Sequence, residues 1–204
     1  MKTLIVQYIP RGERSHTLKV LKAFEEEIKG DVERLDLLES PADVFTADRI
    51  AAYIGRDYLG ETQTVETTEQ LAGMDKFIEQ LKSADVVVLA TPMHNFSLPA
   101  LVKAWFDAVM LKNHTWDIGP EGYRGLLQGK KAIVINASGG IYEGDMAALD
   151  HLQPLAQFEF TFMGFSDVRG ISAAGMNMPD VDKAEVVSKA SERAKSVARE
   201  WYTS

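Results

Sequence analysis

The stretch ADVVVLATPMHNFSLPALVKAWFD, residues 84–107, joins a short apolar run to a segment of helical period. Residues 84–90 are mostly β-branched or aliphatic, which is typical of a strand buried on both faces. From Ser97 onward, apolar residues recur every three or four positions, as on one face of a helix. We expect Ser97 to be the N-cap of this helix and Pro99 to lie in its first turn. A strand followed by an amphipathic helix is the repeating unit of a parallel α/β sheet.

The same alternation runs through the chain and predicts a three-layer α/β/α fold. The predicted strands are residues 3–8, 32–37, 84–90, 131–136 and 168–173, and the predicted helices are residues 16–28, 67–82, the segment from Ser97, 145–163 and 179–202. Five such units predict a doubly wound, five-stranded parallel sheet, for which 2-1-3-4-5 is a common strand order. We expect a single domain over residues 1–204, with an insertion at about residues 39–66 that contains a short helix.

Composition excludes several classes of function. The chain has 22 Lys and Arg against 30 Asp and Glu, a net charge of -8, which argues against nucleic-acid or anionic-membrane partners. It has no cysteine, so disulfides, thiolate nucleophiles and cysteine-based metal sites are excluded, and we expect no metal centre. Redox chemistry would then require an organic cofactor. No segment reads as a signal peptide or a membrane span, so we expect a cytoplasmic protein.

Three loops follow the first, third and fourth predicted strands, at residues 9–17, 91–96 and 137–144. In the 2-1-3-4-5 order, the loops after the first and third strands flank the crevice where ligands bind, and the third loop lies at the same edge. The first loop carries Ser15 and Thr17 at an expected helix N-terminus, where an anion such as phosphate is stabilised, and Arg11 adds positive charge. The alternative is that Ser15 only caps the helix.

The loop at residues 91–96 offers a cover for a flat ligand. Met93, His94 and Phe96 are apolar or aromatic. The amide of Asn95 both donates and accepts hydrogen bonds. These features suit a planar heterocycle, whereas the alternative places Met93 and Phe96 in the core and uses Asn95 to form a turn.

The loop at residues 137–144 contains Gly139 and Gly140 directly after a strand. Missing side chains allow a ring to approach the backbone, and N–H groups there can donate to it. The alternative is an ordinary turn. No Gly-x-Gly occurs in the chain, and GLLQGKK at residues 125–131 does not fit the Walker spacing, so a dinucleotide fingerprint and an ATP-binding loop are both disfavoured.

The loop sequences resemble those of the flavodoxin-like FMN-dependent NADH azoreductases and related quinone reductases. The similarity is carried by Arg11 with Ser15-x-Thr17, by PMHNF at residues 92–96, by Thr115-Trp116, by GLLQGKK and by Ser138-Gly139-Gly140. His94 stands where the family usually has tyrosine, and Tyr8 and Ile9 follow the first strand where a serine is frequent.

This resemblance implies noncovalent FMN, NADH or NADPH as electron donor, and two-electron, ping-pong reduction of quinones or azo compounds with no catalytic side chain required. It also implies a homodimer with each active site at the subunit interface. The cofactor-binding residues that it implies are Arg11, Ser15, His16, Thr17, Pro92, Met93, His94, Asn95, Phe96, Ala137, Ser138, Gly139 and Gly140.

Two other functions stay open at this point. The first is a flavin-binding electron carrier or regulator with no substrate of its own. The second is a serine hydrolase or phosphodiesterase with Ser15 as nucleophile and His16 or His151 as base, although no Gly-x-Ser-x-Gly elbow is present.

Overall fold

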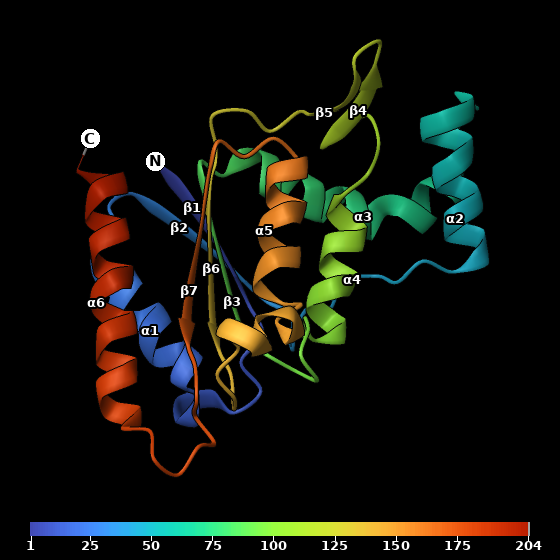
Figure 1. Cartoon of the computed structure of the whole chain (residues 1–204). Helices are drawn as coiled ribbons and strands as arrows, with labels where there is room; N and C mark the ends of the chain where they lie inside the picture. Colours follow the sequence, from blue (N-terminus) through green and yellow to red (C-terminus); the bar gives the residue numbers. More distant parts are fainter. Residues whose placement is uncertain (204) are drawn as a thin grey trace.

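The computed structural model describes residues 1–203, and its centre is a sheet of five parallel strands in the order β2-β1-β3-β6-β7 (Figure 1). The strands are β1 Lys2–Gln7, β2 Asp31–Asp36, β3 Val86–Pro92, β6 Lys131–Ala137 and β7 Asp167–Ala173. Counted among themselves in chain order, they have the predicted order 2-1-3-4-5. The labels differ because a separate hairpin, β4 and β5, lies between β3 and β6 in the sequence.

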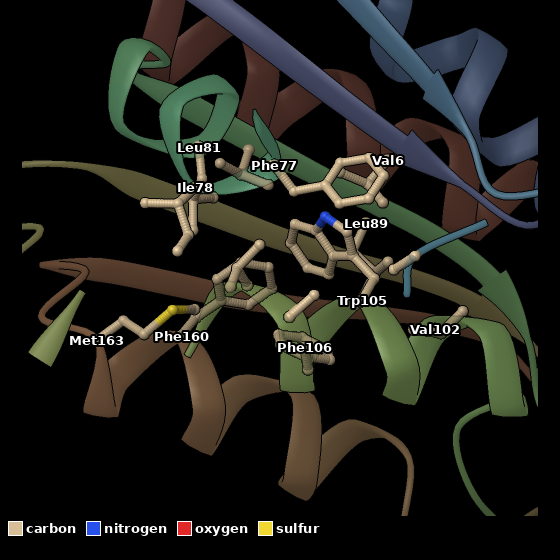
Figure 2. Packing of buried hydrophobic residues seen from close by; sticks show 14 of the residues in the cluster. Val6, Phe77, Ile78, Leu81, Leu89, Val102, Trp105, Phe106, Phe160 and Met163 are labelled. Carbon is tan, nitrogen blue, oxygen red and sulfur yellow. The ribbon is translucent and has the colours of Figure 1, made fainter. Parts of the chain in front are cut away.

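Helices cover both faces of the sheet, with α1 and α6 on one face and α3, α4 and α5 on the other (Figure 1). Their bounds are α1 His16–Glu25, α2 Ala47–Ile54, α3 Val65–Ser83, α4 Ala100–Val109, α5 Gln153–Phe162 and α6 Lys183–Tyr202. Figure 2 shows Trp105, Phe106 and Phe160 between α4, α5 and the sheet residue Leu89, and all four side chains are fully buried. Burial of each such side chain stabilises the fold by about 1.5–3 kcal/mol, so the sheet is a rigid base for its loops.

Three predicted helix starts are wrong. The last helix, expected from residue 179, begins at Lys183, because the side chain of Asp182 caps it by accepting from the N–H groups of Ala184 and Glu185. Ser97 does not cap α4, because its backbone N–H and C=O pair with those of His94, and the helix begins after Pro99. The predicted helix at 145–163 is instead a 3₁₀ helix, η3 Gly144–Leu149, a break, and then α5. The carboxylate of Asp150 accepts hydrogen bonds from the N–H groups of Leu152 and Gln153, which fixes the later start.

The hairpin of β4 Trp116–Gly119 and β5 Gly122–Gly125 was not predicted, and it projects from the body of the molecule (Figure 1). Its strands are four residues long and none of their residues is buried, so they give no alternating apolar pattern. The rings of Trp116 and Tyr123 pack against each other and against Phe162 of α5, which holds the hairpin at its base.

The insertion at residues 39–66 contains the expected short helix, α2, followed by a π-helical turn, η2 Gly55–Leu59. Asp57 on this turn is buried, and it binds Arg56 in an ion pair and His114 through Nε2 at 3.2 Å. The Nζ of Lys112 donates to the Asp57 carbonyl, so the insertion is fastened to the segment that precedes β4. No helix within residues 1–203 is both long and apolar enough to cross a membrane.

Candidate active site

A cavity of about 200 Å³ lies at the carboxyl ends of β1, β3 and β6, where three predicted loops meet. Ten of the predicted residues line it: Arg11, Ser15, His16, Thr17, Pro92, Met93, His94, Ala137, Ser138 and Gly139. These residues come from positions far apart in the sequence. The parallel topology brings them together because the carboxyl ends of β1 and β3 form the switch point of the sheet.

One end of this cavity, which we call the helix-end subsite, is formed by Ser15, His16 and Thr17. Ser15 Oγ accepts a hydrogen bond from Leu18 N at 3.3 Å, so the capping role considered for it is confirmed. Thr17 is fully buried, yet its Oγ1 has no hydrogen-bond partner, and His16 Nδ1 is likewise buried without one. Buried polar atoms are normally paired, so these two atoms are suited to a polar ligand. The N–H groups of the first helical turn add further donors.

The electrostatics of this subsite favour an anion. Burial lowers the pKa of His16, and nearby Lys19, Arg11 and Lys183 lower it further. The imidazole is therefore mostly neutral near pH 7 while the surrounding side chains are cationic. The chain as a whole has a net charge of -8, so this cluster of cationic side chains is a local feature. It is suited to a negatively charged ligand.

A second cavity of about 440 Å³ adjoins the first, because Met93, Gly139 and Asn177 line both. It is lined by Met93, Asn95, Phe96, Gly139, Gly140, Tyr142, Asn177 and Met178. The remaining predicted residues, Asn95, Phe96 and Gly140, therefore lie around this second space. A large space bounded by aromatic, apolar and amide groups suits a flat heteroaromatic ligand.

Asn95 and Phe96 form the tip of a tight turn. Both have positive φ, 46° and 69°, and the flanking His94 and Ser97 exchange two backbone hydrogen bonds of 3.1 and 3.0 Å. Two central residues with positive φ are the mark of a type I′ turn, in which asparagine is common and phenylalanine is strained. The turn role considered for Asn95 is confirmed, and its side chain also lines the cavity. Phe96 is 45% exposed, so the alternative of a core residue is wrong for it.

His94, which stands in place of the family's usual tyrosine, is exposed and packs edge to face on Tyr8, with ring centroids 5.5 Å apart. Tyr8 directly follows β1, so the two rings meet where the β1 and β3 ends lie side by side. Tyr8 and His94, two positions at which the chain differs from the resembled sequences, are therefore in contact with each other, and His94 lines the first cavity.

The structure lacks the pairing of a serine nucleophile with a histidine base that the hydrolase alternative requires. Ser15 Oγ is engaged by the helix N–H, and in the part of the chain that is described neither His16 nor His151 forms a hydrogen bond with it. A serine nucleophile needs a base within hydrogen-bond reach.

Sequence reasoning missed Pro10, Met176 and Asn177, which also line the first cavity. Met176 and Asn177 belong to the loop after β7, whose carboxyl end lies at the same edge of the sheet. The topological rule that selected the other loops applies equally to this one, but its sequence carries no recognisable binding pattern.

Comparison with known proteins places these features in a family. The profile of a family described as having the flavodoxin-like fold matches residues 1–198. FMN-dependent NADH:quinone oxidoreductase 2 of Pseudomonas putida is 36% identical over 163 residues, which cover 80% of this chain and 79% of that protein. The chain belongs to this flavodoxin-like family.

Two further proteins are similar to this chain over different lengths. FMN-dependent NADH:quinone oxidoreductase 3 of Pseudomonas aeruginosa is 43% identical over 119 residues, 58% of this chain and 55% of that protein. An FMN-dependent NADH-azoreductase from Bacillus anthracis, whose crystal structure is in complex with FMN, has 27% sequence identity to this chain, and the two structures superpose with a TM-score of 0.88. This similarity covers 98% of this chain and 99% of that one.

Proposed function

We propose that this protein is an FMN-dependent NAD(P)H oxidoreductase that reduces quinones, azo compounds or both. The observation that carries the proposal is that all thirteen residues expected to bind FMN line two adjoining cavities at the switch point of the sheet. Relatives named as FMN-dependent NADH:quinone oxidoreductases and azoreductases support it.

The residues present fit noncovalent FMN. The unpartnered Thr17 Oγ1 and His16 Nδ1, with the first-turn N–H groups of α1, would hold the phosphate. The second cavity would take the ring, with Met93 and Phe96 as its apolar cover.

The loop that contains Gly139 and Gly140 has free hydrogen-bond donors beside the second cavity. Within the described chain the N–H groups of Gly139 and Gly140 make no hydrogen bond, whereas their carbonyls accept from Asn177 N and Gly175 N. Free N–H groups beside the second cavity would be able to stabilise negative charge that develops on a ligand there.

The chemistry that FMN supplies when bound is the transfer of an electron pair, as hydride, from a nicotinamide to a quinone or azo oxidant in a ping-pong cycle. The protein's part is to bind, orient and exclude water. Met93 and Phe96 would cover the ring, while the amide of Asn95 and the N–H groups of Gly139 and Gly140 would offer hydrogen bonds to its polar atoms. No side chain is required as a general acid for this reaction.

The proposal includes a homodimer with the active site at its interface. On the insertion, six apolar or aromatic residues surround an open cavity of about 600 Å³: Phe45, Ile50, Tyr53, Ile54, Tyr58 and Leu59. We call this surface the insertion face. Leu59 is 66% exposed, and contiguous exposed apolar surface of this kind marks interaction sites. A second copy of the chain could use it as a wall of the substrate site.

Size-exclusion chromatography tests the dimer. We expect the wild-type protein to elute as a dimer and Ile54→Lys as a monomer, because a buried lysine opposes association. Leu38→Lys is the control, since Leu38 is 47% exposed but lies outside the insertion face. An Ile54→Lys protein that stays dimeric would show that another surface is used.

Steady-state kinetics test the activity. The FMN-loaded protein is assayed with NADH and with NADPH, using a quinone and an azo dye as oxidants at several concentrations. Parallel double-reciprocal plots are expected from a ping-pong cycle. Retained FMN without nicotinamide oxidation would refute the enzyme and favour an electron carrier.

A further inference from the structure

The loop after β7 is fixed against the glycine loop by its main chain. Ser138 N donates to Ala173 O at 3.1 Å, and Met176 N and Asn177 N donate to Ser138 O and Gly139 O at 2.9 and 3.0 Å. These hydrogen bonds hold the loop after β7 against the loop after β6, next to the ends of both strands. The backbone of Asn177 therefore has a defined position beside the two cavities.

The side chain of Asn177 occupies the space that a Cβ on Gly139 would need. Such a Cβ would lie 2.5 Å from Asn177 Nδ2, which is too close, 3.1 Å from its Cγ, which is tight, and 3.5 Å from its Cβ, which is ordinary contact. Gly139 does not have a positive φ, so its conformation does not demand glycine. A side chain at Gly139 would therefore have to displace the carboxamide of Asn177.

Asn177 also stands at the junction of the site, since it lines both the first and the second cavity. The residue is exposed, and its carboxamide has no hydrogen bond within the described chain. At this junction the phosphate-bearing chain of a flavin would meet its heteroaromatic ring. A free amide placed there can both donate hydrogen bonds to the polar groups of the flavin and accept hydrogen bonds from them.

We propose that Asn177 is a further cofactor-binding residue, whose carboxamide hydrogen-bonds to the bound flavin where the two cavities meet, and that Gly139 gives this side chain its room. The inference rests on the proposed function. It adds the loop after β7 to the three loops already assigned and gives Gly139 a role that depends on Asn177.

The first test is the FMN dissociation constant of Asn177→Ala, measured by quenching of flavin fluorescence with the apoprotein. Loss of one hydrogen bond predicts binding weaker by about tenfold. The thermal midpoint of the apoprotein should stay unchanged, because the side chain is exposed and makes no other hydrogen bond. Asp180→Ala, an exposed position on the same loop that lines neither cavity, should bind FMN as the wild type does.

A double-mutant cycle with Gly139→Ala gives the sharper test. In the wild-type background the added methyl displaces Asn177, so FMN binding should weaken about as much as in Asn177→Ala. In the Asn177→Ala background the two close contacts are gone, and Gly139→Ala should have little further effect.

Asn177→Ala binding within twofold of the wild type would overturn the inference, as would equal losses from Gly139→Ala in both backgrounds. Both results presuppose FMN binding by the wild type. Failure of the wild-type protein to bind FMN is a different outcome, which refutes the proposed function itself.

Discussion

Thr17→Val separates a ligand-binding hydroxyl from a structural one, because its two expected effects have opposite signs. Thr17 is fully buried and its Oγ1 has no partner. An unpaired buried hydroxyl costs about 1–3 kcal/mol, and valine has nearly the same shape without it. We therefore expect the apoprotein of Thr17→Val to be more stable by about 1 kcal/mol or more, a rise in melting temperature of roughly 2–4 °C for each kcal/mol.

With FMN the sign reverses. The hydroxyl would donate to a phosphate oxygen, and a hydrogen bond to a charged group contributes about 1.5–3 kcal/mol. Thr17→Val should then raise the FMN dissociation constant roughly 10- to 100-fold. The assays are thermal unfolding of the apoprotein and titration of FMN followed by fluorescence.

Thr3→Val is the matched control for this experiment. Thr3 is also fully buried, but its Oγ1 is hydrogen-bonded to Tyr202 OH at 2.6 Å, far from the cavities. Its replacement should destabilise the apoprotein and leave FMN affinity unchanged. If Thr17→Val behaves in the same way, the hydroxyl at position 17 is structural and the phosphate assignment fails.

Two other predictions use single variants. Burial raises the pKa of Glu159 to about 7, with Lys103 opposing the rise, so the folded protein keeps a proton that the unfolded chain has released, and its stability falls as pH rises from about 4.5 to 7. Glu159→Gln removes this loss of stability. Urea unfolding should show that the variant is roughly 3 kcal/mol more stable than the wild type above the folded pKa and as stable as the wild type below pH 4.5. Equal stability of the two proteins at both pH values would contradict this. Asn95→Gly keeps the positive-φ turn and deletes only the amide, so FMN binding should weaken about tenfold without loss of thermal stability; unchanged binding would leave Asn95 with the turn role alone.

The sheet and most of the site could be predicted because they depend on strong, local signals. The strands β1, β3 and β6 are buried over most of their length and read as continuous apolar runs, whereas the edge strands β2 and β7 are more exposed and carry charged residues. All five predicted strands nevertheless lie within two residues of the observed ones. Once the strand order is inferred, the rule that ligands bind at the switch point places residues 9–17 and 91–96 together. These inferences need no knowledge of side-chain contacts.

The features that sequence reasoning missed depend on tertiary contacts. Ser97 has the composition of an N-cap, but its backbone closes the turn with His94, a pairing that no local propensity specifies. The β4–β5 hairpin is held by packing of Trp116 and Tyr123 on Phe162, which belongs to a distant helix. Asn177 reaches the site only because β7 ends beside β6.

The interpretation of the glycine pair was incomplete for the same reason. Space beside Gly139 was expected to admit a ligand ring, yet the direction of its missing side chain is filled by Asn177. At Gly140 the ring of Tyr142 lies in the corresponding place, with its hydroxyl 3.1 Å from the position of a Cβ. The ligand must therefore meet the free N–H groups of the loop and the side chains packed on it.

The most direct test of the account is the visible absorption spectrum of the purified protein after addition of FMN and removal of the unbound excess by gel filtration. We predict a retained flavin band at one FMN per chain, which NADH or NADPH bleaches under anaerobic conditions and a quinone restores. A protein that elutes colourless after this treatment would contradict the assignment of both cavities to FMN.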